Sequence, residues 1–475
     1  MDRPKPPETT SQAAALVGGL VARARAAQMV ADGYDQARID ELVAAAGWAI
    51  LEPARNRALA ELAVRDTGIG DVEDKVLKNH RKTLGLLRDL AGRKTVGVIS
   101  EDAATGITEI ARPVGVVCAV TPSTNPAATP ANKIINALKA RNAVIVAPSP
   151  KGASTCAKLI EYVHAQFDRI GAPRDLVQML PSPVTKETTG ELMRQSDLVV
   201  ATGSQANVRA AYASGTPAFG VGAGNVAAIV DETADLDDAA AKIVASKTFD
   251  NATSCSSENS VVLVEAIADR MLAALGRQGC IEVKGEDRAR LEACMWPEGK
   301  LSPAVIGQSV AVIAERAGLA DPKARGARIL LVAESGVGSA HRFSGEKLSP
   351  VLTVYRVRDF DDAKAIVARI YEYQGSGHSV SLHSKREERA LDLGLHLPVA
   401  RVIVNQVHSV ANGGSFSNGL PVSLSMGCGT WGRNNFSDNM NVRHYMNVTR
   451  VARPIPERVP SVDELLGAYF TRWGK

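Results

Sequence analysis

Apolar runs that alternate with helical segments between residues 142 and 215 are the feature that most constrains the fold. "NAVIVAPSPKG" has the pattern of a buried strand and its loop, and "ASTCAKLIEYVHAQFDRIG" has the pattern of a helix that ends at Gly171. "LVQMLPS" and "SDLVVATGSQANVRAAYASG" repeat the alternation. A parallel, doubly wound sheet is the natural fold for such a chain.

The alternation returns between about Leu236 and Ser425, which predicts a second α/β domain. A chain of 475 residues exceeds what one hydrophobic core supports, so two or three domains are expected. Residues 12–90 have a helical pattern and are predicted to be scaffold. The strands predicted in the second domain are 261–265, 329–333, 351–356, 379–383 and 401–405.

Composition excludes several classes of protein. The net charge is only +4 and aromatic residues make up 4%, so the pattern of a nucleic-acid-binding surface is absent. Six irregularly spaced cysteines and eight histidines without an H-E-x-x-H motif predict neither disulfides nor a bound metal. No signal-peptide core and no apolar run of roughly 20 residues is present, so we expect a cytoplasmic protein without a membrane segment.

Cys255 lies in "FDNATSCSSENS", among small polar residues just before a predicted strand. A cysteine is more often a small buried hydrophobe, and that alternative stays open. Polar neighbours instead favour a loop or a helix start, where amide dipoles lower the pKa of a thiol and make it a nucleophile. Cys428 in "SMGCGTWG" has glycines that suggest only a close-packed turn.

Three loops follow predicted strands and are candidates for ligand contacts. In "VTPSTNPAATP", Asn125 is either a turn residue or an amide donor at the end of a strand. "APSPKG" and "ATGSQ" each open a helix, where amide groups can hold phosphate, although such loops are often plain connections. "GVGAGN" precedes a strand rather than a helix, so we interpret it as a tight turn. The cofactor candidates in these loops are Thr121, Ser149, Lys151, Gly203 and Ser204.

These motifs, taken in order, resemble those of the aldehyde dehydrogenase superfamily, and within it the CoA-acylating branch. The resemblance spans nearly the whole chain and rests on "TPSTNP", "RNAVIVAPSPK", "ATGSQANVRAAYASGTPAFGVGAGN", "FDNATSCSSENS", "EKLSPVLTVYR", "GSGHSVSLHS" and "LSMGCGTWGRNN". It implies that Cys255 is the nucleophile and that the Asn125 amide and the Cys255 backbone N–H stabilise the oxyanion. It also implies that Glu346 holds the nicotinamide ribose, although a surface charge is the alternative.

The family's hydrolytic members carry a glutamate base in an "ELGG" motif, and Gly220 stands at that place here. Without that carboxylate water is poorly activated, whereas the thiol of coenzyme A deprotonates more readily, so acyl transfer to CoA is expected. A hydrolytic enzyme and a non-catalytic assembly subunit are the alternatives. His378 matches a histidine of acylating members that would assist CoA, but a lone histidine is also commonly structural.

Cofactor and substrate are less constrained by the resemblance. No acidic residue follows the "VIV" strand and Lys151 is near, so both NAD and NADP are expected candidates, with a slight preference for NADP. Arg433 in "GTWGRNN" would suit an anionic aldehyde, although a solvated arginine is the alternative. This loop is similar to that of acylating sulfoacetaldehyde dehydrogenases. We therefore hypothesise sulfoacetaldehyde, with acetaldehyde or another short aldehyde as the alternative.

The resemblance also implies a domain plan: two doubly wound α/β domains and a small β arm that pairs subunits. The predicted dinucleotide-binding domain comprises residues 1–99 and 114–240, and the catalytic domain comprises residues 241–430. The hairpin 100–113 and the tail 431–475 are predicted to form the oligomerisation arm of a homodimer or homotetramer.

Overall fold

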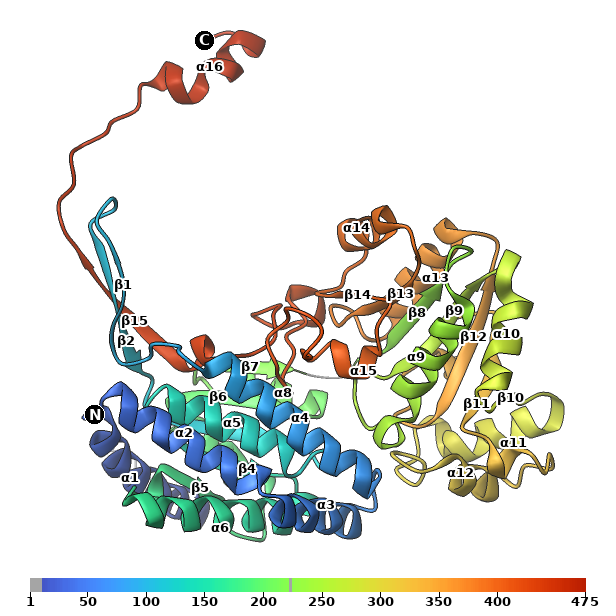
Figure 1. Ribbon diagram of the computed structural model, residues 1–475, viewed down its shortest axis with the longest axis horizontal. Helices are drawn as coiled ribbons and strands as arrows, with labels where there is room; N and C mark the ends of the chain where they lie inside the picture. Colours follow the sequence, from blue (N-terminus) through green and yellow to red (C-terminus); the bar gives the residue numbers. More distant parts are fainter. Residues whose placement is uncertain (1–10, 222–223) are drawn as a thin grey trace, which may run out of the picture.

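The computed structural model describes residues 11–221 and 224–475, which form three β-sheets (Figure 1). Two of the sheets are parallel and one is antiparallel, so the predicted α/β class with a small β arm is confirmed. Residues 1–10 of the predicted first domain and residues 222–223 of "GVGAGN" lie outside the described part of the chain.

Five parallel strands form the sheet of the first domain, in the order β5-β4-β3-β6-β7. Their bounds are β3 Val116–Thr121, β4 Ala143–Pro148, β5 Val177–Met179, β6 Leu198–Thr202 and β7 Ala218–Val221. Every residue of β3 and β4 is buried, as expected for strands covered by helices on both faces. Because β4 and β6 flank β3 on opposite sides, the carboxyl end of β3 is where such a sheet binds ligands.

Helices cover this sheet, and the first four confirm the helical pattern of residues 12–90. The helices are α1 Gln12–Asp32, α2 Gln36–Leu51, α3 Pro53–Thr67, α4 Val72–Leu90, α5 Ala128–Lys139, α6 Ala153–Ile170, α7 Lys186–Gln195 and α8 Gln205–Ala213. Each of the first four begins where a side-chain oxygen accepts hydrogen bonds from free backbone N–H groups; these caps are Ser11, Asp35, Glu52 and Asp71.

Seven parallel strands form the sheet of the second domain, in the order β10-β11-β12-β9-β8-β13-β14. The strands are β8 Val226–Val230, β9 Glu258–Val264, β10 Cys280–Glu282, β11 Ile329–Ala333, β12 Val351–Val357, β13 Val380–His383 and β14 Val402–Val404. The helices are α9 Leu236–Thr248, α10 Ala268–Arg277, α11 Gly285–Met295, α12 Val310–Ala317, α13 Phe360–Tyr373, α14 Glu387–His396 and α15 His408–Ala411. The five strands predicted here are all present.

The predicted boundary between the domains at residue 240 is wrong. Strand β8 pairs with β9 and β13, so the chain enters the second sheet by Val226. The apolar run of β8 resembles the buried strands of the first sheet, and only its pairing partners decide to which sheet it belongs.

The third sheet is the β arm, in which β1 Gly97–Asp102, β2 Ile107–Pro113 and β15 Met446–Ala452 are antiparallel. Figure 1 shows this arm reaching beyond the first domain, with α16 Val462–Trp473 at the far end of an extended segment. The predicted hairpin and the alternating tail are thus present.

Part of the predicted tail does not belong to the arm. Met440, Val442 and Tyr445 are buried in the same apolar core as strands β3 and β4 of the first domain. The boundary at residue 431 is therefore wrong, because 431–445 holds core residues before the chain enters β15. No helix in the described residues is long and apolar enough to cross a membrane.

Three buried histidines lie in the second domain: His378, His383 and His408. Burial lowers the pKa of His383 and of His408 to about 4, and it lowers the pKa of His378 well below its ordinary value. The unfolded chain therefore binds more protons than the folded one below a pH of about 6.5. Each histidine costs stability as the pH falls through this window.

We expect His383→Leu to remove one of these costs. Relative to the wild type, the variant should gain about 1.4 kcal/mol of unfolding free energy for each pH unit between about 6.5 and about 4. Urea unfolding of both proteins across this range measures the difference. A difference that does not change with pH would contradict the assignment of a neutral His383.

Candidate active site

Cys255 lies in a turn between a short 3-10 segment, Phe249–Ala252, and strand β9. The backbone just before it is left-handed, with φ of 51°, 51° and 59° at Asp250, Asn251 and Ala252. Such conformations cost about 1–3 kcal/mol each in residues other than glycine and persist only where the surroundings hold them. The loop predicted from the polar sequence is present, but no helix begins at the cysteine.

The thiol of Cys255 faces an imidazole. His378 Nε2 lies 3.3 Å from Cys255 Sγ, and His378 Nδ1 lies 2.8 Å from the hydroxyl oxygen of Ser379. Burial, followed by the nearby Glu346 carboxylate, raises the pKa of Cys255 to about 12. The expectation of a lowered thiol pKa is therefore wrong, because burial disfavours the thiolate, Glu346 adds to this effect, and no helix begins at Cys255 to offset it.

The imidazole is suited to take the thiol proton. Burial, followed by the charge of Arg401, lowers the pKa of His378 well below its ordinary value, so the ring is neutral. A neutral ring within hydrogen-bond reach of a protonated thiol is the arrangement of a general base and its nucleophile. The structure thus brings His378 and Cys255 together as a pair.

Glycines allow the loop before β13 to place His378. Gly375 and Gly377 have φ of 94° and 85°, and a Cβ on Gly377 would overlap the carbonyl of Cys428. Arg401 then donates from Nη2 to the His378 carbonyl at 3.0 Å and to the Gly427 carbonyl at 2.8 Å. The glycines of "GSGHS" therefore allow the backbone to pack closely against Cys428, and this packing places His378.

Asn125 follows β3 and is oriented from the neighbouring helix. Lys78 on α4 donates from Nζ to Asn125 Oδ1 at 2.9 Å. Because the carboxamide oxygen is used by the ammonium group, the amide N–H groups remain as donors. This is the orientation that an oxyanion donor needs.

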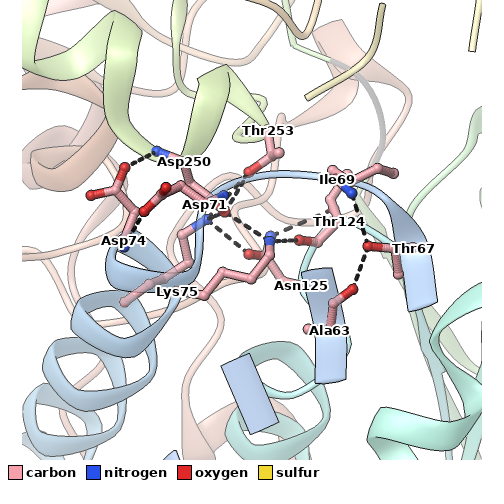
Figure 2. Close-up of polar contacts among 11 residues, drawn as sticks. Ala63, Thr67, Ile69, Asp71, Asp74, Lys75, Thr124, Asn125, Asp250 and Thr253 are labelled. Atoms are coloured by element: carbon pink, nitrogen blue, oxygen red, sulfur yellow. Dashed lines mark hydrogen bonds and ion pairs between the residues drawn. The ribbon is translucent and has the colours of Figure 1, made fainter. Parts of the chain in front are cut away.

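A buried carboxylate connects this helix with the cysteine loop (Figure 2). Asp250 accepts hydrogen bonds from Lys75 at 3.1 Å and from the Thr253 hydroxyl at 2.7 Å, and it also pairs with Lys78. Burial alone would raise the pKa of Asp250, but the two lysines outweigh it and hold the pKa below its ordinary value. One ionised group therefore fixes both the left-handed turn and the cations of α4.

A cavity of about 590 Å³ lies beside this network, with Asn125 and Ser254 in its wall. Four basic side chains and no carboxylate occur among its described lining residues; they are Lys78, Arg81, Lys82, whose pKa burial lowers to about 7, and Lys242. Arg433, the substrate candidate from the sequence, is exposed and is not among the residues that line this cavity. The structure therefore does not bring Arg433 together with Asn125 there.

A second cavity, of about 430 Å³, opens at the carboxyl ends of β3 and β4. Thr121 and Ser149 line it, as do Lys186 and Asn207, which the sequence did not indicate. The hydroxyl of Thr121 is buried and has no hydrogen-bond partner among the described residues, so it is available to a ligand. The residues at this edge fit the ribose and phosphates of a dinucleotide.

The sequence also predicts that Gly203, Ser204, Lys151 and Glu346 contact the dinucleotide. Ser204 caps α8, and Gly203 precedes it with φ of 147°. Lys151 is exposed in the segment after Ser149. Burial raises the pKa of Glu346 to about 8, and the Gly224 backbone N–H donates to its carboxylate.

Comparison with known proteins identifies the family. The sequence profile of the aldehyde dehydrogenase family matches residues 8–281. This chain belongs to the aldehyde dehydrogenase family. It is 65% identical to the acylating sulfoacetaldehyde dehydrogenase of Cupriavidus necator, over 99% of this chain and 95% of the relative. Identity to the acylating sulfoacetaldehyde dehydrogenase of Bilophila wadsworthia is 44%, over 95% of this chain and 98% of the relative.

A solved structure of an aldehyde dehydrogenase has the same fold as this chain. The acetylating aldehyde dehydrogenase of Geobacillus thermoglucosidasius superposes with a TM-score of 0.90 at 36% identity, covering 95% of this chain and 99% of that chain. The predicted membership of the aldehyde dehydrogenase family, among its acylating members, is therefore confirmed.

Several residues of this aldehyde dehydrogenase site gave no sequence signal. Lys75, Lys78 and Arg81 read as ordinary charges of a solvated helix, and Asp250 as a polar loop residue. Arg401 stands at the start of a predicted strand, where a charge is common. Their roles come from contacts between distant segments, such as the 172 residues that separate Lys78 from Asp250.

We expect Lys78→Met to slow acyl-enzyme formation by about 10- to 100-fold with little change in KM, because Asn125 loses the partner that orients its amide. Lys75→Met is the matched control, since Lys75 pairs with the same Asp250 but does not contact the Asn125 side chain. Rapid-mixing measurement of the first turnover distinguishes the two. Equal rate losses in both variants would mean that the ion pair matters only for stability.

We expect His378→Gln to slow alkylation of Cys255 by iodoacetamide about tenfold at pH 7, because the thiol then has no base to accept its proton. The deficit should shrink only at strongly alkaline pH, since the thiol ionises on its own only near its pKa of about 12. Mass spectrometry of the Cys255 peptide measures the rate. His383→Leu, which removes another buried histidine, should leave it unchanged, and a similar deficit in that variant would contradict the pairing.

Proposed function

We propose that this protein oxidises sulfoacetaldehyde with NADP or NAD and transfers the acyl group to coenzyme A, giving sulfoacetyl-CoA. The observation that carries the chemistry is the Cys255 thiol 3.3 Å from the neutral His378 imidazole. The names of the two acylating relatives and the cationic cavity beside Asn125 support the substrate.

In the first half-reaction, Cys255 Sγ attacks the aldehyde carbon while its proton moves to His378 Nε2. The carbonyl π electrons move to oxygen, and Asn125 Nδ2 together with the Cys255 backbone N–H stabilises the oxyanion. A bound nicotinamide dinucleotide supplies the acceptor for the hydride that leaves this carbon. The chain then holds the acyl group as a thioester on Cys255.

In the second half-reaction, His378 first releases its proton to solvent and is again a neutral base. It accepts the proton of the CoA thiol as that sulfur attacks the thioester carbon. The bond to Cys255 Sγ breaks, and the departing thiolate takes the proton from His378. The sum is one acyl-CoA, one reduced dinucleotide and one released proton for each aldehyde.

The surroundings of Gly220 support CoA over water as the acceptor. The Tyr212 hydroxyl accepts from the Gly220 N–H at 3.1 Å and donates to its carbonyl at 3.3 Å. A Cβ at this position would lie 2.7 Å from Val208 Cγ1, so helix α8 occupies the space of a side chain. A thiol, with a pKa of about 8.5, needs less help from a base than water does.

For the dinucleotide, we propose contacts from Thr121, Ser149, Gly203 and Ser204 at the edge of the first sheet. Lys151 and the cavity-lining Lys186 would suit a 2′-phosphate, which keeps the preference for NADP. Glu346 is proposed for the nicotinamide ribose. Its raised pKa, about 8, means that a protonated carboxyl is available near neutral pH.

We also propose a homodimer or homotetramer in the cytoplasm. The exposed strand β1 and the projecting helix α16 are surfaces that a second subunit would cover. Leu465, Tyr469 and Trp473 on α16 are between 59% and 69% exposed. The six cysteines are all unpaired, as in proteins of a reducing compartment.

Turnover of sulfoacetaldehyde, acetaldehyde and propionaldehyde, each with and without CoA and with both dinucleotides, tests this function. We expect sulfoacetaldehyde with CoA to give the highest kcat/KM. With CoA omitted, we expect a burst of about one reduced dinucleotide per active site and then a stall, because the thioester on Cys255 has no acceptor.

Cys255→Ala is the control and should abolish the burst. Full-rate turnover without CoA would instead indicate a hydrolytic enzyme. A higher kcat/KM for acetaldehyde would indicate a short-chain aldehyde dehydrogenase. Activity retained in Cys255→Ala would contradict the assignment of the nucleophile.

A further inference from the structure

The cations that line the larger cavity differ in what else they bind. Lys82 donates to the carbonyls of Val410, Gly413 and Gly414 at 3.2, 2.9 and 2.9 Å. An ammonium group has three N–H donors, and all three are used by this backbone. Lys82 therefore fixes the loop after α15 and has no donor left for a ligand.

Two further cations have carboxylate partners. Lys78 is held by Asp250 and by Asn125, as described for the oxyanion donor. Lys242 pairs with Asp238, one turn away on α9. The charge of Lys242 is therefore compensated. Lys78 shares the single charge of Asp250 with Lys75, but its three N–H groups are used by Asp250, Asn125 and Thr253 and none is left for a ligand.

Arg81 is the exception among the four. Within the described part of the chain its guanidinium has neither an ion pair nor a hydrogen bond, and it lies over the ring of Phe416 at 5.2 Å from the centroid. This cation–π contact restrains the guanidinium while its N–H groups remain available. The edge of a guanidinium matches two oxygens of an oxoanion.

The position of Arg81 along helix α4 also suits a contact with the anionic end of a bound substrate. It lies three residues after Lys78 on α4, about 4.5 Å further along the axis, and both side chains line the same cavity. Lys78 contacts Asn125, which marks the oxyanion end of the substrate. In sulfoacetaldehyde the sulfonate is bonded to the carbon beside the carbonyl, so its oxygens lie a few bonds from that end. Ser415 and Ser417 add hydroxyl groups to the same wall.

We propose that Arg81 binds the sulfonate of the substrate and thereby selects anionic aldehydes. This inference rests on the proposed function, since it names the residue that gives the acylating dehydrogenase its substrate class. The chemistry recognised is a compact oxoanion, which the phosphates of CoA or of the dinucleotide also present. Separate KM values for each substrate distinguish these sources.

Arg81→Gln tests the inference, with Arg433→Gln as the matched control. Both arginines are exposed, but only Arg81 lines the cavity, and Arg433 is the cation that the sequence alone favours. We expect Arg81→Gln to lower kcat/KM for sulfoacetaldehyde by about 10- to 100-fold, mainly through KM. Turnover of uncharged propionaldehyde and the KM values for CoA and dinucleotide should stay within about twofold. Arg81→Lys should recover part of the loss.

Several outcomes would overturn the inference. Equal losses on both aldehydes would make Arg81 a structural residue, and a raised KM for CoA or dinucleotide alone would assign it to a phosphate. A selective loss in Arg433→Gln but not in Arg81→Gln would transfer the role to Arg433. If the wild type does not turn over sulfoacetaldehyde, the proposed function itself fails. Wild-type turnover with an unaffected Arg81→Gln variant overturns only this inference.

Discussion

The buried carboxylate of Asp250 is the interaction on which the rest of the site depends. It pairs with Lys75 and Lys78 of the first domain and belongs to the left-handed turn that presents Cys255 in the second. Removing one partner of a buried ion pair typically costs about 3–5 kcal/mol, because the other charge is left without compensation. Cys255 and Asn125, the proposed nucleophile and oxyanion donor, therefore come from different domains but are held by the same buried ion pair.

Burial of Cys255 and His378 determines the protonation state of the pair. The protein raises the pKa of the Cys255 thiol and lowers that of His378, so the resting pair is neutral rather than an ion pair. Charge then develops only as the sulfur attacks, where the His378 imidazolium and the Asn125 amide can stabilise it. A neutral resting pair is compatible with the proposed transfer to a thiol, which needs less activation than water.

The two cavities differ in the elements that line them. The smaller one follows the edge of the parallel sheet, with Thr121 and Ser149 in its wall. The larger one follows helix α4, whose cations hold a backbone loop, orient Asn125 and, in Arg81, present a free guanidinium. One helix face thus carries a lysine that fixes a loop, the lysine proposed to orient Asn125 and the arginine proposed to recognise the substrate.

The sequence by itself determined the parallel α/β class, five of the seven strands of the second sheet, the β arm and the candidate nucleophile, because apolar periodicity and polar loop composition are local. It could not assign β8 to its sheet or place 440–445 in the first core, since pairing and packing partners are distant. Only the tertiary structure decided the direction of the thiol pKa shift, the contact with His378 and the contacts from which roles for Lys78 and Arg81 are proposed. Those properties arise from burial and from contacts between segments far apart in the chain, such as Lys78 and Asp250 at a separation of 172 residues, which no local pattern encodes.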